Sequence, residues 1–360
     1  MPLQLLLGAS GTGKTKLLYE KLIASAAARP SLRHIALVPE QFTMETQRRL
    51  VTMTPNHAIL NIDILSFERL AYRVFEEQNL EEWQILDDIG KNMLLRRVAG
   101  KKKKELLVFQ KNLGRAGFIS RMKSMLSELY QYGVGEEELT EMMERVKDQP
   151  LLNRKLSDIL VFYRAFAEEM GQRTIPAEEL LLILAKTLPR SKFLKGAVVA
   201  MDGFTGFTPV QYQIVAEMLR QCGLVTMAFT LPEGVPLEPI EEFELFSVSK
   251  TSVKRLKETA KNVREPVELF YAPCPKTGPV RFDGQPALAH LERYLYRYGS
   301  GSVWQGRPEG ISLHLAQNPR SESELAAQEI RRLVQEEGLR YREIAVVTGD
   351  LPGYRPYLTK

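Results

Sequence analysis

Short apolar runs alternate with stretches of helical spacing over the first eighty residues. The runs predict three buried strands, at Pro2–Leu7, His34–Val38 and Ala58–Leu65. Helical spacing predicts helices at Lys14–Ala28 and Thr43–Leu50, and a third helix that Ser66 would cap. Strands that alternate with helices in this way are typical of an α/β protein, with a parallel sheet covered by helices on both faces.

The pattern changes between residues 85 and 190. Apolar positions recur there at helical spacing and predict six helices, at Ile85–Ala99, Glu105–Leu113, Ala116–Tyr132, Glu136–Val146, Leu152–Met170 and Ala177–Leu188. Gly100, Gly133 and Pro150 separate some of these helices. No segment of this region has the pattern of a strand, so we expect an all-helical insertion.

The alternation of strands and helices then returns. It predicts strands at Ala197–Met201, Leu224–Thr230 and Val267–Tyr271, and helices at Pro209–Gln221 and Ala287–Tyr296. Four glycines in Arg297–Gly310 indicate a linker. A strand, a helix and a strand are predicted after it, at Ile311–Ala316, Glu322–Glu337 and Ile344–Thr348.

These elements predict a domain organisation. Residues 1–84 and 191–300 would form one α/β domain, with residues 85–190 as its insertion. A single strand–helix–strand unit buries too little apolar surface to stand alone. Residues 311–360 are therefore expected to be the start of a second, truncated α/β domain.

Composition limits the protein class. Apolar residues make up 44% and charged residues 26%, as in ordinary soluble globular proteins. Two cysteines, Cys222 and Cys274, and four scattered histidines exclude a disulfide framework or a four-cysteine metal site. The sequence has neither an apolar run of about 18 residues nor a signal-peptide pattern. We expect a reduced, cytoplasmic protein without a membrane segment.

Positive charge is concentrated in the insertion. Residues 101–130 contain eight Lys or Arg and two Glu, a net charge of +6, whereas the whole chain carries +5. Four of these cations are consecutive: Lys101, Lys102, Lys103 and Lys104. Such a concentration suits contact with a phosphate backbone. It equally suits a solvated loop whose lysines complement the end of the preceding helix.

One motif with phosphate chemistry lies between the first predicted strand and helix. It matches the P-loop pattern G-x-x-x-x-G-K-[ST] and consists of Gly8, Ala9, Ser10, Gly11, Thr12, Gly13, Lys14 and Thr15. The glycines let backbone N–H groups turn toward phosphate oxygens, and the helix N-terminus adds its dipole. Lys14 would reach the β- and γ-phosphates of ATP, and the Thr15 hydroxyl would bind Mg²⁺. A chance glycine-rich turn is the alternative, which the flanking strand and helix disfavour.

A P-loop protein also needs a carboxylate for Mg²⁺ at the end of a neighbouring strand. Asp202 directly follows the strand Ala197–Met201 and is the candidate, although it could merely cap a turn. A helicase is expected to place Glu next, to prepare the attacking water, but position 203 is Gly. Asp202 comes 188 positions after Lys14, farther than in small nucleotide kinases. A helical insertion between the two elements is the layout of the RecA-like P-loop core in superfamily 1 helicases.

Six segments of the chain resemble one family, in the same order. They are LLLGASGTGKT at 5–15, ALVPEQFT at 36–43, ILSFERLAYRVF at 64–75, LDDIGKNMLLRRV at 86–98, LSDILVFYRAF at 156–166 and MDGFTGFTPVQ at 201–211. The family they resemble is AddB, the B subunits of bacterial AddAB helicase–nucleases. The P-loop alone would be weak evidence for this family, whereas VPEQFT together with DGFTGFTP is specific.

The resemblance implies a subunit that pairs with AddA and binds DNA double-strand ends and single-stranded DNA during recombinational repair. In this family AddA carries the principal motor, and AddB serves mainly to scan DNA and recognise the hotspot sequence Chi. The family also has a C-terminal nuclease domain with a cysteine-ligated 4Fe–4S cluster. Two cysteines cannot supply its four ligands. We therefore expect an N-terminal portion that has ATP and Mg²⁺ as cofactors and lacks the cluster.

Two loops correspond to positions where a superfamily 1 helicase contacts DNA. Gln41 and Ser66 could hydrogen-bond to phosphate, and Phe42 or Phe67 could stack on a base, contributing ~1–3 kcal/mol each. The alternative is that both phenylalanines pack under helices. Lys101–Lys104 are further candidates for DNA contact, by their charge.

Three functions remain open from the sequence. The first is an ATP-binding, helicase-like portion of a DNA-end-processing subunit, with weak or no hydrolysis by itself and no nuclease site. The second is a free-standing P-loop kinase or ATPase, which would require a lid with arginines that the sequence lacks. The third is an interaction scaffold with a vestigial P-loop. Gly203 favours the scaffold, whereas Lys14 and Thr15 oppose it.

Overall fold

The computed structural model describes residues 3–80, 84–171, 174–274, 279–297 and 303–358. The chain divides into two compact units, Met1–Asp283 and Gly284–Lys360, which are described separately. Pro2 and part of the expected linker Arg297–Gly310 lie outside the described residues. Each described helix is too short or too polar to cross a lipid bilayer.

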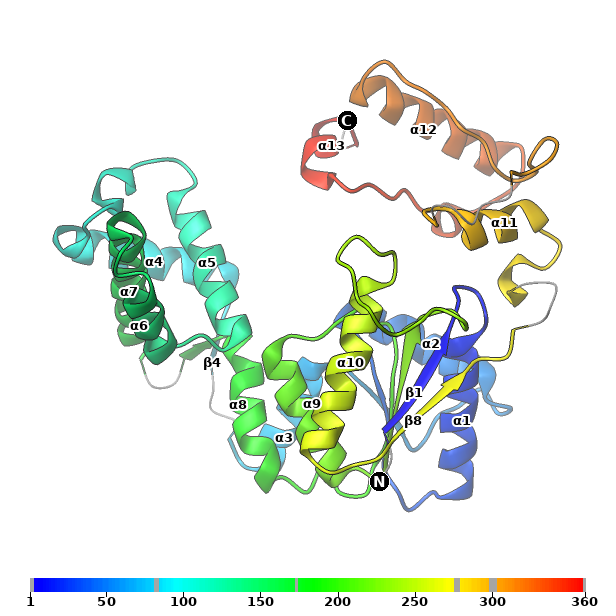
Figure 1. The fold of residues 1–360 in the computed structure, drawn as a ribbon, viewed down its shortest axis with the longest axis horizontal. Helices are drawn as coiled ribbons and strands as arrows, with labels where there is room; N and C mark the ends of the chain where they lie inside the picture. The colour runs from blue at the N-terminus through cyan, green and yellow to red at the C-terminus, as the bar shows by residue number, and fades with distance from the viewer. Residues whose placement is uncertain (1–2, 81–83, 172–173, 275–278, 298–302, 359–360) are drawn as a thin grey trace. The chain divides into compact units, whose positions relative to one another are not determined.

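A six-stranded sheet with the order β3-β2-β6-β7-β1-β8 forms the centre of the first unit (Figure 1). All five neighbouring pairs in this sheet are parallel. The strands are β1 (Leu3–Gly8), β2 (His34–Leu37), β3 (Ile62–Leu65), β6 (Val198–Met201), β7 (Leu224–Thr230) and β8 (Val267–Tyr271). The expected α/β class with a parallel sheet is confirmed.

Helices cover both faces of this sheet. One face carries α1 (Lys14–Ala28) and α2 (Thr43–Met53), and the other carries α3 (Phe67–Glu77), α8 (Leu180–Thr187), α9 (Pro209–Gln221) and α10 (Ser247–Asn262). Side chains of a strand alternate between faces. Accordingly Leu6 packs in the cluster with α1, whereas Leu5 and Leu7 pack in the cluster with α3 and α9. Both faces of β1 are thus buried, which explains its uninterrupted run of leucines.

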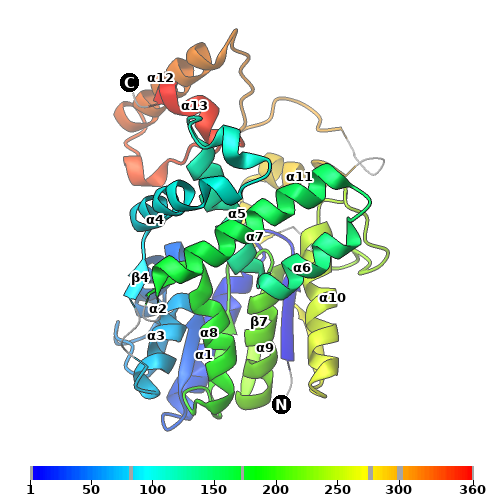
Figure 2. The ribbon, with the colours of Figure 1, turned by 90° about the vertical axis from the view of Figure 1, so that its left-hand side faces the viewer.

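The insertion is built from α4 (Asp88–Lys102), α5 (Phe118–Tyr132), α6 (Glu136–Arg145) and α7 (Pro150–Met170). Figure 2 shows these helices beside one another. The helices α4, α5 and α7 share a core to which α7 contributes Phe162 and Phe166, and α6 packs on α7 through Leu139 in a smaller cluster. The expectation that the region has no strand is wrong. The chain enters through β4 (Gln84–Leu86) and returns through β5 (Thr174–Pro176), and these two short strands pair in parallel. Their pairing joins segments about ninety positions apart, which local periodicity cannot show.

Two other features of the insertion differ from the prediction. The helix expected at Glu105–Leu113 is replaced by two 3₁₀ turns, Lys103–Glu105 and Phe109–Asn112. Between them the buried carboxylate of Asp158 accepts three backbone N–H groups, which a continuing helix would have used within its own turns. The helix α8, inside the range expected for the insertion, packs on the sheet core.

The second unit contains α11 (Pro286–Tyr294), α12 (Pro319–Gln335) and α13 (Leu351–Leu358). The strands expected at Ile311–Ala316 and Ile344–Thr348 are not formed, so this part of the prediction is wrong. A strand needs a neighbour to take its backbone hydrogen bonds, and no described segment pairs with either run. The side chains of Leu313 and Val347 are accordingly 91% and 93% exposed.

Candidate nucleotide site

The P-loop connects the end of β1 to the start of α1. Gly11 and Gly13 have φ angles of 79° and 87°, a region that side-chain-bearing residues rarely adopt. No side chain caps α1, and its first turn contains no acidic residue. The backbone donors at the start of α1 are therefore available to an anion, which the helix dipole would also attract.

Lys14 and Thr12 hold the loop from within. The Lys14 ammonium donates to the carbonyl of Gly8 at 3.0 Å and to that of Ala9 at 2.7 Å. The buried Thr12 hydroxyl also donates to the Ala9 carbonyl, at 3.0 Å. The Lys14 charge is thus kept against the loop, where a phosphate oxygen could replace a carbonyl as its partner.

Asp202 follows β6 at the same carboxyl edge of the sheet. The strand β7 lies between β1 and β6, so Asp202 and Gly8 are two strand spacings apart, roughly 10 Å at ~4.8 Å per spacing. The backbone N–H of Asp202 donates to the Leu37 carbonyl at 3.2 Å. Burial, and next the charge of Asp202, raise the pKa of the Tyr19 hydroxyl above its ordinary range. Tyr19 lies one helical turn after Thr15, so the charge of Asp202 acts on the first turns of α1.

Thr15 and Asp202 are the candidate ligands for Mg²⁺ at this site. Among the described residues, no three His, Cys, Asp or Glu side chains gather as metal ligands. The Thr15 hydroxyl and the Asp202 carboxylate are hard oxygen donors of the kind that Mg²⁺ prefers. Two such groups suit an ion whose remaining ligands are phosphate oxygens and water.

Gly203 has a backbone conformation that disfavours a side chain, and therefore a catalytic carboxylate, at this position. Its φ angle is 77°. A Cβ atom added there would lie 3.2 Å from Cδ2 of Phe42 and 3.4 Å from Cδ of Pro39. A Glu side chain at this position would therefore require both a strained backbone and displacement of the Phe42 ring.

The four loop residues expected to contact DNA fall into two groups. Gln41 and Phe42 are exposed, with 39% of Phe42 accessible. Phe67 is 5% exposed and packs edge-on against Phe204 at 5.5 Å, so it lies in the core. Ser66 is also buried, and its hydroxyl caps α3 by accepting the backbone N–H of residue 69 at 3.2 Å. In this arrangement Gln41 and Phe42 are accessible at the carboxyl edge, and Ser66 and Phe67 are not.

The four consecutive lysines also differ from one another. Lys101 pairs with Glu169, which also pairs with Arg97 at 3.0 Å. Lys102 pairs with Glu105 at 3.1 Å. Lys103 and Lys104 are exposed and form no ion pair with a described residue.

Sequence reasoning missed a segment that packs on the P-loop. The backbone N–H of Arg281 donates to the Gly11 carbonyl at 3.2 Å. A Cβ atom at Gly11 would lie 2.9 Å from Cβ of Arg281 and 3.3 Å from the Phe282 ring. The segment is brought there because β8 pairs with β1. No local signal marks it, since the contact spans about 270 positions.

Comparison with known proteins decides the family. A family model described as ADDB, N-terminal, matches residues 5–292. The chain belongs to this AddB family. It is 38% identical over 356 residues to the B subunit of the ATP-dependent helicase/deoxyribonuclease of Lachnoclostridium phytofermentans, covering 98% of the chain and 31% of that relative. It is 33% identical to the B subunit from Acetivibrio thermocellus and 35% identical to that from Symbiobacterium thermophilum, over 98% of the chain and 30% and 31% of those relatives.

The resemblance found in the six sequence segments is therefore confirmed. The chain spans about a third of the length of these AddB-family relatives and corresponds to their N-terminal part.

Proposed function

We propose that this chain is the nucleotide- and DNA-binding N-terminal portion of the B subunit of a helicase–deoxyribonuclease. It would act in the cytoplasm with an AddA subunit on DNA double-strand ends, in recombinational repair. The observation that carries the proposal is the P-loop Gly8–Thr15 at the carboxyl edge of a parallel sheet, in a chain of the AddB family. Ligands of such sheets bind at this edge.

The proposal assigns a RecA-like core to residues 1–84 and 191–300, with Mg²⁺–ATP at the P-loop. Lys14 would exchange its carbonyl partners for β- and γ-phosphate oxygens, and the N–H groups at the start of α1 would surround the phosphates. Thr15 and Asp202 would hold the Mg²⁺ that neutralises the phosphate charge.

Hydrolysis of ATP by this chain would be weak or absent. A water attacking the γ-phosphate needs a carboxylate that orients it and takes its proton. Gly203 leaves no side chain there, and its positive φ and the Phe42 ring restrict the position. This site suits a subunit that scans DNA and recognises Chi while its AddA partner supplies most of the motor activity.

The exposed pair Gln41 and Phe42 would contact the DNA strand at the carboxyl edge. Gln41 can donate to a phosphate, and the accessible Phe42 ring can stack on a base. Both belong to the 3₁₀ turn Glu40–Phe42 that comes after β2, and Phe42 lies against the glycine that follows Asp202, so DNA contact and the nucleotide site would be adjacent.

Two other functions predict different results. A free-standing P-loop kinase would bind ATP without DNA, and a scaffold with a vestigial P-loop would bind no ATP. Co-purification with AddA and binding to DNA ends distinguish the proposed subunit from the kinase.

The test is calorimetric titration of Mg²⁺–ATP into the chain and two variants. Lys14→Ala should weaken binding strongly, because it removes the cation that faces the phosphates. Lys16→Ala is the matched control, since Lys16 is an exposed lysine on the same helix, 3.8 Å from Glu20. Equal affinity of the wild type and Lys14→Ala would contradict the nucleotide site.

A further inference from the structure

A large basic cavity of the insertion lies between the second half of α4 and the start of α5. It has a volume of about 1110 Å³. Four cationic side chains line it, those of Arg96, Lys103, Lys111 and Arg115, and none of the described residues that line it is acidic. This volume exceeds the ~300–1,000 Å³ of pockets that enclose a small molecule. It can therefore hold part of a polymer.

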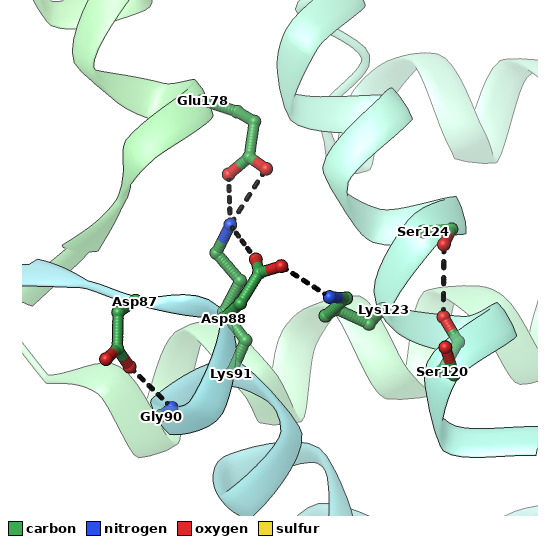
Figure 3. Close-up of polar contacts among 8 residues, drawn as sticks. All are labelled: Asp87, Asp88, Gly90, Lys91, Ser120, Lys123, Ser124 and Glu178. Carbon is green, nitrogen blue, oxygen red and sulfur yellow. Dashed lines mark hydrogen bonds and ion pairs between the residues drawn. The ribbon is translucent and has the colours of Figure 1, made fainter. Parts of the chain in front are cut away.

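The described residues do not compensate the positive charge of this cavity. None of the four cationic side chains forms a hydrogen bond or an ion pair with a described residue. Neighbouring cations do. Arg97 and Lys101 pair with Glu169. Lys123 pairs with Asp88, as Figure 3 shows. Several cations near the cavity thus have acidic partners, whereas the four that line it have none among the described residues. An anionic ligand would supply those partners.

The start of α5 adds a backbone anion site to the same cavity. Gly117, with φ 82°, precedes the helix, so no side chain caps it, and the first turn contains no acidic residue. Ile119 and Ser120, whose N–H groups belong to that turn, line the cavity. Cβ atoms at Gly114 and Gly117 would meet nothing within 4 Å, so the backbone is open to a ligand. Uncapped N–H groups and the helix dipole favour phosphate oxygens.

A second cavity, of about 460 Å³, adjoins the first and shares Arg115 and Ala116 with it. Its other lining is mostly apolar and includes Phe109, Phe118 and Met125. The rings of Phe109 and Phe118 meet edge to face at 5.7 Å. An apolar cavity beside a phosphate site suits a nucleobase.

We propose that the two cavities together bind single-stranded DNA. Arg96, Lys103, Lys111, Arg115 and the start of α5 would take the phosphates, and the apolar cavity would take a base. Duplex DNA fits this arrangement poorly, because its bases are stacked inside the helix and present only their edges. The inference rests on the proposed function for its ligand, DNA, and assigns a site separate from the P-loop.

The test measures binding of a fluorescent oligo-dT of roughly 16 nucleotides to the whole chain at several salt concentrations. Lys111→Ala with Arg115→Ala should weaken binding about tenfold and lower the salt slope by about 1.4, at ~0.7 for each phosphate that is no longer neutralised. The matched control is Lys147→Ala with Lys155→Ala. These lysines are also exposed, lie in the same insertion and have no described ion pair.

Two further measurements test the single-strand assignment. Met125→Gln should weaken oligo-dT binding without changing its salt slope, because Met125 is 41% exposed and lines only the apolar cavity. A duplex of equal length should be bound more weakly, and its affinity should fall less in Lys111→Ala with Arg115→Ala. Free dTMP should not compete at comparable concentrations.

Several results would overturn the inference. We call the double variant Lys111→Ala with Arg115→Ala the cavity pair and the double variant Lys147→Ala with Lys155→Ala the control pair. If both lose the same affinity for oligo-dT, the loss is a general effect of charge and does not come from this site. If the cavity pair weakens duplex binding as much as oligo-dT binding, or if free dTMP competes with oligo-dT, the ligand of the cavities is not a single strand of DNA. If the wild type binds oligo-dT and the cavity pair binds it equally well, only this site fails. If the wild type binds no DNA, the DNA part of the proposed function fails with it.

Discussion

The ammonium of Lys91 lies 2.8 and 2.7 Å from the two carboxylate oxygens of Glu178 (Figure 3). It is also 3.6 Å from Asp88, whose other oxygen accepts a hydrogen bond from Lys123 at 2.7 Å. Lys91 belongs to α4, Glu178 to the 3₁₀ turn Ala177–Glu179, and Lys123 to α5. The network joins the first two helices of the insertion to the segment by which the chain leaves it.

Removing Lys91 should therefore destabilise the protein. Its side chain is 5% exposed and that of Glu178 is 23% exposed. Lys91→Ala leaves the carboxylate largely buried without its cation, and we expect the free energy of unfolding to fall by about 3 kcal/mol. Arg145→Ala breaks the exposed pair with Glu141 and should cost less than about 1 kcal/mol. Urea denaturation measures both, and equal losses would show that the buried pair contributes no more than a surface pair.

The same pair predicts how stability depends on pH. Burial alone would raise the pKa of Glu178, but hydrogen bonds from Lys91 and Ser127 outweigh it, and the pKa lies below its ordinary value. A lowered pKa stabilises the fold above the unfolded value of about 4.3 and ceases to do so as pH falls through the folded value. In Lys91→Ala burial dominates and raises this pKa, so acid favours the folded variant. The stability difference between wild type and Lys91→Ala should shrink below about pH 4. Denaturation at pH 7 and in acid tests this, and a constant difference would contradict it.

The sequence was sufficient where a local pattern coincides with a local structure. The P-loop, the strands around it and the helices α1, α2, α3, α8 and α9 follow from apolar spacing, glycines and the position of Lys14, whereas α10 was not predicted. It was insufficient where contacts between segments distant in the sequence decide whether a strand forms or whether a side chain is buried. Leu313 and Val347 lie in runs typical of buried strands, yet without a pairing neighbour neither run forms one. Phe67 follows a strand as a DNA-contacting residue would, but Phe204 covers its ring.

Asp158 illustrates the same limit and provides another prediction. Its fully buried carboxylate accepts the N–H of Leu107 at 2.7 Å on one oxygen, and those of Val108 and Phe109 at 2.8 and 2.7 Å on the other. Asp158→Asn keeps the volume but replaces one acceptor oxygen by an NH₂ group facing an N–H donor. We expect the free energy of unfolding to fall by about 3 kcal/mol, because one charged acceptor is lost and one buried N–H donor is left unpaired. This segment leads to Lys111, so oligo-dT binding should weaken as well. Unchanged stability in urea would show that the three N–H groups find other partners.

The conformation of Gly203 predicts that a carboxylate placed at this position will not create ATPase activity. Adding the missing carboxylate as Gly203→Glu should not raise ATP hydrolysis, because the residue would adopt φ near 77° and meet the Phe42 ring. The strained backbone should cost ~1–2 kcal/mol. Gly196→Ala is the control, since its φ is 72° and its Cβ would meet nothing within 4 Å. Steady-state ATPase assays with calorimetric ATP titration check the prediction. Turnover that appears in Gly203→Glu and disappears with Lys14→Ala would show that the loop accommodates a catalytic carboxylate.

Gly11 and Gly13 separate two reasons why the P-loop requires glycine. Both have positive φ, so alanine at either position should lower the free energy of unfolding by ~1–2 kcal/mol. A Cβ at Gly13 meets nothing within 4 Å, whereas one at Gly11 would lie 2.9 Å from Cβ of Arg281. Gly11→Ala should therefore lose more stability than Gly13→Ala and should displace the segment that follows β8.

A double-variant cycle isolates that collision. Arg281→Gly removes the Cβ that Gly11→Ala would strike, so the two changes together should be less destabilising than the sum of the single effects. Gly13→Ala with Arg281→Gly should be additive, because no contact links them. Urea denaturation of the six proteins gives both coupling energies. A coupling of zero between Gly11 and Arg281 would mean that the segment after β8 does not pack on the P-loop in solution, and that only the backbone conformation requires glycine at position 11.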